Sequence, residues 1–144
     1  MSDRQTAQQL NSGAIHLLRR LRVVDRQAGL TSARLSALSV LVFGGPHSLG
    51  ALAAAEDVTS PTMTRIVDGL ERAKLARRRV LTGPGRPVEV SATPRGRRLM
   101  ERAAGRRLDA LEAAIAQLPA GDRVALRTAA PILDTLATHL RTDT

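Results

Sequence analysis

TSPTMTRIVDGLERAKL, which runs from Thr59 to Leu75, contains the most informative helix signal in the chain. Ser60 is a suitable N-cap, and Pro61 at the next position costs no hydrogen bond because the first N–H groups of a helix have no partner within it. Apolar residues then recur at i, i+3, i+4 and i+7, which predicts a helix with one buried stripe. The members of this stripe are Met63, Ile66, Val67 and Leu70.

The other face of this predicted helix is polar and basic. It carries Thr62, Thr64, Arg65, Asp68 and Arg72. Short hydroxyls and a guanidinium near the N-terminal end of a helix can contact both phosphates and base edges. We interpret the segment as a DNA recognition helix; from these residues alone, an ordinary amphipathic surface helix stays an open alternative.

Length and charge agree with a single DNA-binding domain over residues 1–144. The chain has 144 residues, no Trp or Tyr and one aromatic residue, Phe43, so its core must be aliphatic, which favours helices. The net charge is +9. Residues 59–107 hold 13 basic and 4 acidic residues, a surplus that equals the charge of the whole chain. Such a footprint indicates a polyanionic partner, with nucleic acid favoured over a membrane surface.

Several classes of function are disfavoured by what the sequence lacks. Without cysteine there is no disulfide scaffold, thiolate metal site or thiol switch. The three histidines, His16, His47 and His139, fall on separate predicted elements, and no nucleophile motif is present. We therefore expect no enzyme activity, no metal and no cofactor. No leader opens the sequence and no apolar run approaches the ~18 residues of a membrane span, so we expect a soluble cytoplasmic protein.

Four helices are predicted up to the end of the DNA recognition helix that follows Thr59. The first covers about residues 5–28, and the second follows Thr31 as N-cap and ends at Gly44-Gly45-Pro46. Ser48 then caps a short third helix, and the residues 56–59 form a tight connection to the helix after Thr59. Two short helices joined by such a turn, the second with polar residues at its start, predict a helix-turn-helix.

A β-hairpin is predicted directly after the stretch from Thr59 to Leu75. Residues 76–81 and 87–92 have strand character, and the segment between them is rich in glycine. At its tip, Arg86 is placed to enter a minor groove, where the negative potential favours a guanidinium. We expect Arg77, Arg78 and Arg79, at the base of the hairpin, to contact the phosphate backbone, with simple solvation as the alternative for one or two of them.

Two more helices are predicted at the end of the chain. Thr93-Pro94 starts a long one that reaches Leu118, and the last runs from about Asp122 to His139 and contains Pro131, which should bend it or remove one hydrogen bond. Together with residues 5–28, the segment 94–141 offers more apolar surface than a DNA-binding head over about residues 30–93 needs. The surplus predicts helices that form a homodimer.

The order of these elements resembles the MarR family of winged helix-turn-helix transcriptional regulators. The residues that carry the resemblance are LTSARLSALSVLV, LGALAAAEDVTSPTMTRIVDGLERAKLARR and VEVSATPRGRRL. It implies a mainly α fold with a small β-hairpin wing (α+β) and a homodimer on a palindromic operator. By the same resemblance, Arg86 is the wing arginine, although Gly83-Pro84-Gly85 replaces the usual preceding acidic residue. The major-groove positions would be Ser60, Pro61, Thr62, Thr64 and Arg65.

The resemblance also implies release from DNA by a small-molecule effector. We expect a small anionic aromatic ligand in a cleft lined by His16, Arg20, Phe43 and Met100, with core packing as the alternative role of the last two. The resulting expectation is a sequence-specific transcriptional repressor that binds double-stranded DNA. Two other classes stay open: a nonspecific architectural DNA-binding protein, and a module whose basic face meets an acidic protein.

Overall fold

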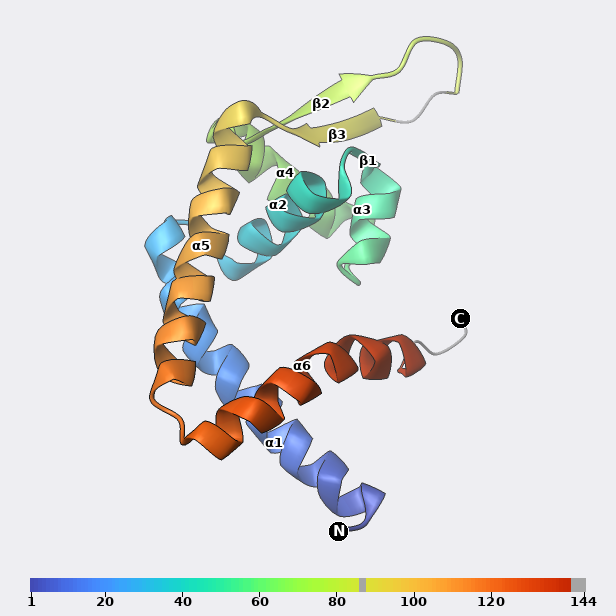
Figure 1. The fold of residues 1–144 in the computed structure, drawn as a ribbon. Coiled ribbons are helices and arrows are strands. Elements are labelled where there is room, and N and C mark those ends of the chain that lie inside the picture. The colour runs from blue at the N-terminus through green and yellow to red at the C-terminus, as the bar shows by residue number, and fades with distance from the viewer. Residues whose placement is uncertain (86–87, 141–144) are drawn as a thin grey trace. The chain divides into compact units, whose positions relative to one another are not determined.

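The computed structural model describes residues 1–85 and 88–140, and the chain forms two compact units. Met1–Arg107 is the first unit, and it holds α1 to α4, a small sheet and α5 up to Arg107. The second unit, from Leu108 onward, holds the end of α5 and α6 (Figure 1). The predicted class, mainly α with a small β-hairpin wing, is confirmed.

The first unit begins with α1, which spans Asp3–Asp25. The Ser2 hydroxyl accepts from the Gln5 N–H at 3.2 Å, and the Gln5 side chain accepts from the Ser2 N–H at 2.9 Å. This reciprocal capping box satisfies donors that would otherwise have no partner in the first helical turn. A 3-10 turn, η1 over Arg26–Ala28, follows directly, so the helix predicted over residues 5–28 is present with a tightened last turn.

The centre of the first unit is α2, over Ser32–Gly44. Thr31 caps it as predicted, since its hydroxyl accepts from the Arg34 N–H at 3.3 Å. The side chains of Leu35, Leu38 and Leu41 are almost completely removed from solvent. The buried core of the unit comprises Leu35, Ala37, Leu38, Leu41, Val42, Leu52, Ala53, Met63, Val67, Leu70, Leu75, Ala76, Val90, Met100 and Ala103.

The helix-turn-helix consists of α3 over Leu49–Ala55 and α4 over Ser60–Arg72. Ser48 caps α3 as predicted, with its hydroxyl 3.1 Å from the backbone nitrogen of Ala51. Between the helices, Asp57 has a left-handed backbone with φ 52°. The turn is therefore tight enough to hold the two helices as one unit.

The predicted cap of α4 was wrong by one residue. Thr59 is the N-cap, because its backbone is extended and its hydroxyl accepts from the Thr62 N–H at 3.3 Å. Ser60 is already helical, and Pro61 follows it in the first turn. The buried stripe of α4 is nevertheless the predicted one, with Met63, Val67 and Leu70 fully enclosed and Ile66 partly buried.

A three-stranded antiparallel sheet follows in the order β1-β3-β2. The hairpin strands are β2 over Ala76–Val80 and β3 over Val88–Ala92, and they extend beyond the helices as a wing (Figure 1). The third strand, β1, covers only His47–Ser48 and pairs His47 with Val90. Sequence periodicity did not predict β1, because two residues are too few to show an alternating pattern.

Two long helices end the described chain. Pro94–Ala116 forms α5, whose start is fixed by the Thr93 hydroxyl accepting from the Gly96 N–H at 3.0 Å, as the Thr93-Pro94 pair predicted. The last helix, α6 over Ala120–His139, begins two residues before its predicted start and contains Pro131 in its interior. None of the helices within residues 1–85 and 88–140 has the length and apolar character that a membrane span needs.

Candidate functional site

The N-terminal half of α4 presents a polar face opposite its buried stripe. Ser60, Pro61, Thr62 and Arg65 are exposed, whereas Thr64 is half-buried and its hydroxyl donates to the Ser60 carbonyl at 3.0 Å. Thr62 is ordered by the Thr59 hydroxyl, which lies 2.9 Å from its own. Among the described residues, Arg65 has no ion-pair or hydrogen-bond partner. Its guanidinium is thus available to a ligand at the exposed end of the helix.

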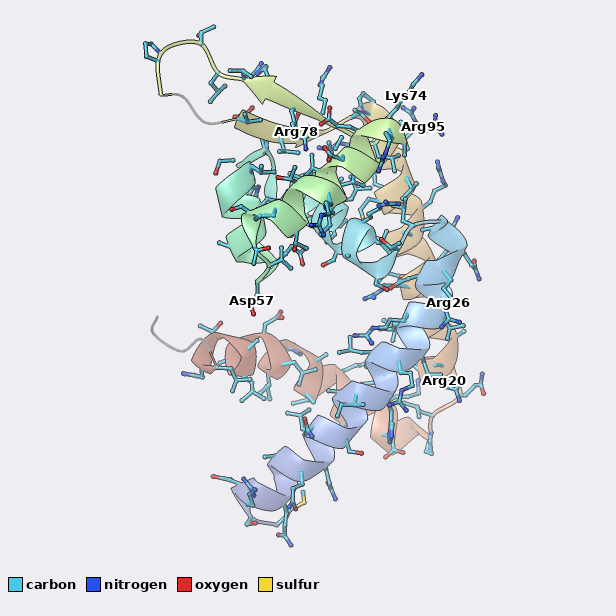
Figure 2. The ribbon with its side chains drawn as sticks, turned by 180° about the vertical axis from the view of Figure 1, so that it is seen from behind. Arg20, Arg26, Asp57, Lys74, Arg78 and Arg95 are labelled. Carbon is cyan, nitrogen blue, oxygen red and sulfur yellow. The ribbon has the colours of Figure 1, made fainter. Side chains whose placement is uncertain are left out.

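Arg78 connects the wing to α4. Its guanidinium lies 2.6 Å from the Asp68 carboxylate, donates to the Thr64 carbonyl at 3.2 Å and also contacts the Glu71 carboxylate. Figure 2 labels Arg78 on the strand beside α4. These three partners follow one another along one side of α4. The hydrogen bond to Asp68, opposed in part by burial, raises the pKa of Arg78 above its ordinary value, so the group stays charged. Because its donors are engaged by these partners, we propose that Arg78 positions α4, and its predicted phosphate contact stays a prediction.

Arg77 and Arg79 lie on the other face of β2, because side chains alternate along a strand. Arg77 is exposed and faces Ser91 across the ladder. Arg79 faces Glu89, with a guanidinium nitrogen 3.4 Å from the carboxylate, and its side chain is 72% exposed. Because an ion pair this exposed contributes little stability, Arg79 can readily exchange Glu89 for another anion. A groove of about 430 Å³ beside these strands is lined by residues from both faces of β2: Pro46, Arg77, Arg78, Arg79, Glu89 and Ser91.

The tip of the wing is described up to Gly85. Gly83 and Gly85 have φ values of 114° and 70°, in the region that glycine adopts most readily, which explains the glycine-rich turn. Arg86, the predicted minor-groove residue, lies outside the described residues. Its role stays a prediction.

The model of the MarR family matches residues 30–86, which include α2, the helix-turn-helix and the first strand of the wing. An uncharacterised HTH-type transcriptional regulator of Mycobacterium bovis is 33% identical over 132 residues, which cover 92% of each chain. The chain belongs to the MarR family. It is therefore a DNA-binding transcriptional regulator, and its family is one of regulators rather than of enzymes.

Solved structures of the MarR family have the same fold. A MarR family protein from Bacillus stearothermophilus superposes with a TM-score of 0.81 at 23% identity, covering 96% of this chain and 99% of that chain. NadR, solved in complex with 4-hydroxyphenylacetate, gives a TM-score of 0.69 at 22% identity, covering 93% of this chain and 91% of that chain. At these identities the match extends the family's fold over nearly the whole chain, beyond residues 30–86.

The MarR-family chain also has a cavity of about 480 Å³ within its first unit, between α1, α2 and α5. Hydroxyl, cationic and apolar side chains share its wall, a mixture that is typical of small-molecule sites. Phe43 is 67% exposed, whereas Met100 is buried. The lining residues are Leu18, Arg22, Asp25, Ser32, Leu35, Ser36, Ser39, Phe43, Met100, Ala103, Ala104 and Arg107.

The two cationic residues of the cavity differ in their partners. Arg107 makes a two-pronged ion pair with Asp25, with Nε 2.7 Å from Oδ1 and Nη2 2.6 Å from Oδ2. This hydrogen bonding, against a smaller effect of burial, raises the pKa of Arg107 above its ordinary value. Arg22 has no ion pair among the residues that the structure describes. It is the cation with free donors for a bound anion.

The cavity includes only part of the predicted effector set. Phe43 and Met100 line it, whereas His16 and Arg20 do not (Figure 2 shows Arg20 along α1). Leu18, Arg22 and Asp25 follow one another at i, i+4 and i+7 and so share one face of α1, from which Arg20 is turned away. That spacing was visible in the sequence, but which face of α1 meets α2 and α5 was not.

Proposed function

We propose that this MarR-family regulator is a sequence-specific repressor that binds a palindromic operator as a homodimer. The observation that carries the proposal is the exposed end of α4, where Arg65 has free donors beside Ser60, Pro61 and Thr62. These side chains reach base edges when the helix lies in a major groove. Repression needs no further surface, since a dimer on a promoter blocks access to it.

The basic surplus supports DNA as the partner. Residues 59–107 carry a surplus equal to the net charge of +9, and they contain α4, the wing and every basic residue of α5. A dimer that neutralises about 6 to 10 phosphates should lose about 10³- to 10⁵-fold in affinity between about 50 and 200 mM salt. A nearly flat salt dependence would exclude this surface as the DNA interface.

A second copy of the chain is the partner that the helices at both ends require. On α1, the large apolar side chains Leu10, Ile15, Leu17, Leu18 and Val23 are 38% to 51% exposed. On α6, where no residue is buried, Val124, Leu126, Ile132, Leu133 and Leu136 are exposed. Faces of this kind are usually covered in oligomers. A two-fold dimer would also set two copies of α4 about 34 to 36 Å apart, one turn of DNA.

The experiment that tests the proposal combines operator selection with sedimentation. We expect selection from random DNA to yield a palindrome, and the full chain to sediment as a dimer that prefers the palindrome over scrambled DNA by about 10³-fold or more. Leu133→Glu should shift the chain to monomer and abolish operator binding, whereas the neighbouring exposed Thr135→Glu should not. Equal affinity for palindromic and scrambled DNA would instead favour an architectural protein.

We further propose that the cavity between α1, α2 and α5 binds a small aromatic monoanion that releases the operator. Arg22 and Arg107 with Asp25 leave a net charge of +1, and Phe43 offers an exposed ring. NadR, with the same fold, was solved with an aromatic carboxylate. In this revised proposal Arg22 takes the role first assigned to Arg20.

Calorimetry and thermal unfolding with 4-hydroxyphenylacetate and benzoate test this ligand proposal. We expect a rise in melting temperature together with weaker operator binding, because a ligand shifts an equilibrium only by its differential affinity for the two states. Arg22→Ala should remove the effect, and Arg20→Ala should preserve it. A ligand that stabilises the protein equally well in both variants would exclude Arg22 as the anion contact.

A further inference from the structure

Ser36 connects the wall of the cavity to the helix-turn-helix. It lies on α2, where it lines the cavity, and its hydroxyl donates to the Glu56 carboxylate with both Oε1 and Oε2 at 2.8 Å. Glu56 is the C-cap of α3 and does not line the cavity. A hydroxyl has a single proton to donate. Any anion in the cavity that takes this proton therefore takes it from Glu56.

Glu56 stands at the point where α3 ends and the turn toward α4 begins. Its own N–H donates to the Leu52 carbonyl at 3.2 Å, and the next residue, Asp57, has a left-handed φ of 52°. Figure 2 labels Asp57. The Val58 N–H donates to the Ala53 carbonyl at 3.0 Å. The bond to Ser36 thus ties this turn, and with it the start of α4, to α2.

The geometry points to Ser36 as the residue through which cavity occupancy reaches the recognition helix. We propose that a bound carboxylate accepts the Ser36 proton in place of Glu56. Glu56 then loses its one side-chain hydrogen bond within the described chain and faces a second anion nearby. This inference rests on the ligand class proposed for the cavity, and it adds the contact that makes that ligand a regulator.

Two features of the cavity make this exchange of acceptors specific. Ser32, Ser36 and Ser39 all line the wall from α2, but Ser39 donates its proton to the Ser36 carbonyl at 2.6 Å. Ser32 makes no hydrogen bond to Glu56 among the described residues. Of the three serines at this wall, Ser36 is the one whose hydroxyl reaches Glu56 in the described structure, and Ser32 provides a control at the same wall.

The first test measures coupling between benzoate and operator DNA in the full chain. We expect benzoate to weaken operator binding of the wild type by about 5- to 150-fold, the usual range for allosteric coupling. In Ser36→Ala, calorimetry should still detect benzoate binding, but the ratio of operator affinities without and with benzoate should fall toward 1. Ser32→Ala should keep the wild-type ratio. A Ser36→Ala variant with the full wild-type ratio would overturn the proposal.

A second test needs no ligand. Ser36→Asp places a carboxylate beside Glu56, as a bound anion would, whereas Ser32→Asp adds the same charge to the same wall away from it. We expect Ser36→Asp to weaken operator binding at least 5-fold more than Ser32→Asp. Equal losses in the two variants would overturn the link even if benzoate acts on the wild type.

Amide hydrogen exchange separates failure of the link from failure of the proposed function. The N–H groups of Asp57 and Val58 close the turn on the Ala54 and Ala53 carbonyls, and they should exchange faster in Ser36→Asp than in Ser32→Asp. Faster exchange without benzoate binding would uphold the link and refute the ligand. Unchanged exchange in a chain that binds benzoate and operator would refute the link alone.

Discussion

Arg78 on β2 and Asp68 on α4 are 2.6 Å apart, and this contact fixes the wing to α4. The same guanidinium reaches the Thr64 carbonyl and Glu71, so one side chain holds three residues spaced i, i+4 and i+7 along α4. A DNA-binding surface made from two elements needs them in one fixed relation. We therefore assign to this arginine an indirect role in DNA recognition, through the orientation of α4.

Arg78→Ala should destabilise the protein and Arg77→Ala should not. Loss of the Arg78 contacts is expected to cost about 1 to 2 kcal/mol of unfolding free energy, a modest value because the pair is partly exposed. Arg77 is exposed and has no ion pair among the described residues, so its removal should leave stability within about 0.5 kcal/mol. Urea unfolding of the two variants checks this.

The salt dependence of DNA binding should change in Arg77→Ala and not in Arg78→Ala, the reverse of the order expected for stability. Removing a phosphate contact lowers the slope of log K against log salt by about 1, which we expect for Arg77→Ala. Arg78→Ala should leave the slope unchanged and reduce the preference for the operator. A reduced slope in Arg78→Ala with normal stability would return Arg78 to the phosphate contacts.

Arg65→Ala should relax the preference at one base pair of each half-site. The expected cost is about 1 to 3 kcal/mol per half-site, the value of a good base contact. Stability should be unchanged, because this side chain has no partner in the described structure. Arg72→Ala, at the C-terminal end of the same helix, is the control, with a smaller loss that does not depend on sequence. Binding to single-base operator variants distinguishes the two, and equal losses across all sequences would restrict Arg65 to phosphate contact.

Gly96→Ala should be strongly destabilising. A Cβ at this position would lie 2.0 Å from the Leu75 carbonyl oxygen and 3.2 Å from Cδ1 of Leu38, and the backbone atom has no room to move. We expect a cost of about 2 to 4 kcal/mol in unfolding free energy. Gly105→Ala on the same helix is the control: nothing lies within 4 Å of its Cβ, so helix propensity should stabilise it by about 0.5 to 1 kcal/mol. Similar melting temperatures for both variants would contradict the close approach of α5 to Leu75.

Lys74→Gly should stabilise the protein. Lys74 has a φ of 61° and is held there because its carbonyl accepts the Thr93 hydroxyl at 2.7 Å. Left-handed backbone costs a side-chain-bearing residue about 1 to 2 kcal/mol, which exceeds the added unfolded-state entropy of glycine. We expect a net gain of about 0.5 to 1 kcal/mol. Lys74→Ala keeps the strain while it removes the charge, so an equal gain there would assign the effect to charge.

The sequence alone determined the elements that depend on local signals. Helix periodicity predicted the buried stripe of α4, and the caps at Thr31, Ser48 and Thr93 fixed where helices begin. These features need only neighbours within one or two turns, so a single chain segment encodes them. The glycine-rich hairpin was predictable for the same reason.

Only the tertiary structure decided which arginine of the run Arg77 to Arg79 forms contacts with α4. Strand alternation separates Arg78 from Arg77 and Arg79, but which face of β2 meets α4 depends on packing between distant segments. The same holds for Arg22 rather than Arg20 in the cavity, and for Ser36 and Glu56, which lie 20 residues apart. Long-range contacts of this kind are set by how helices pack on one core, and no local spacing contains that information.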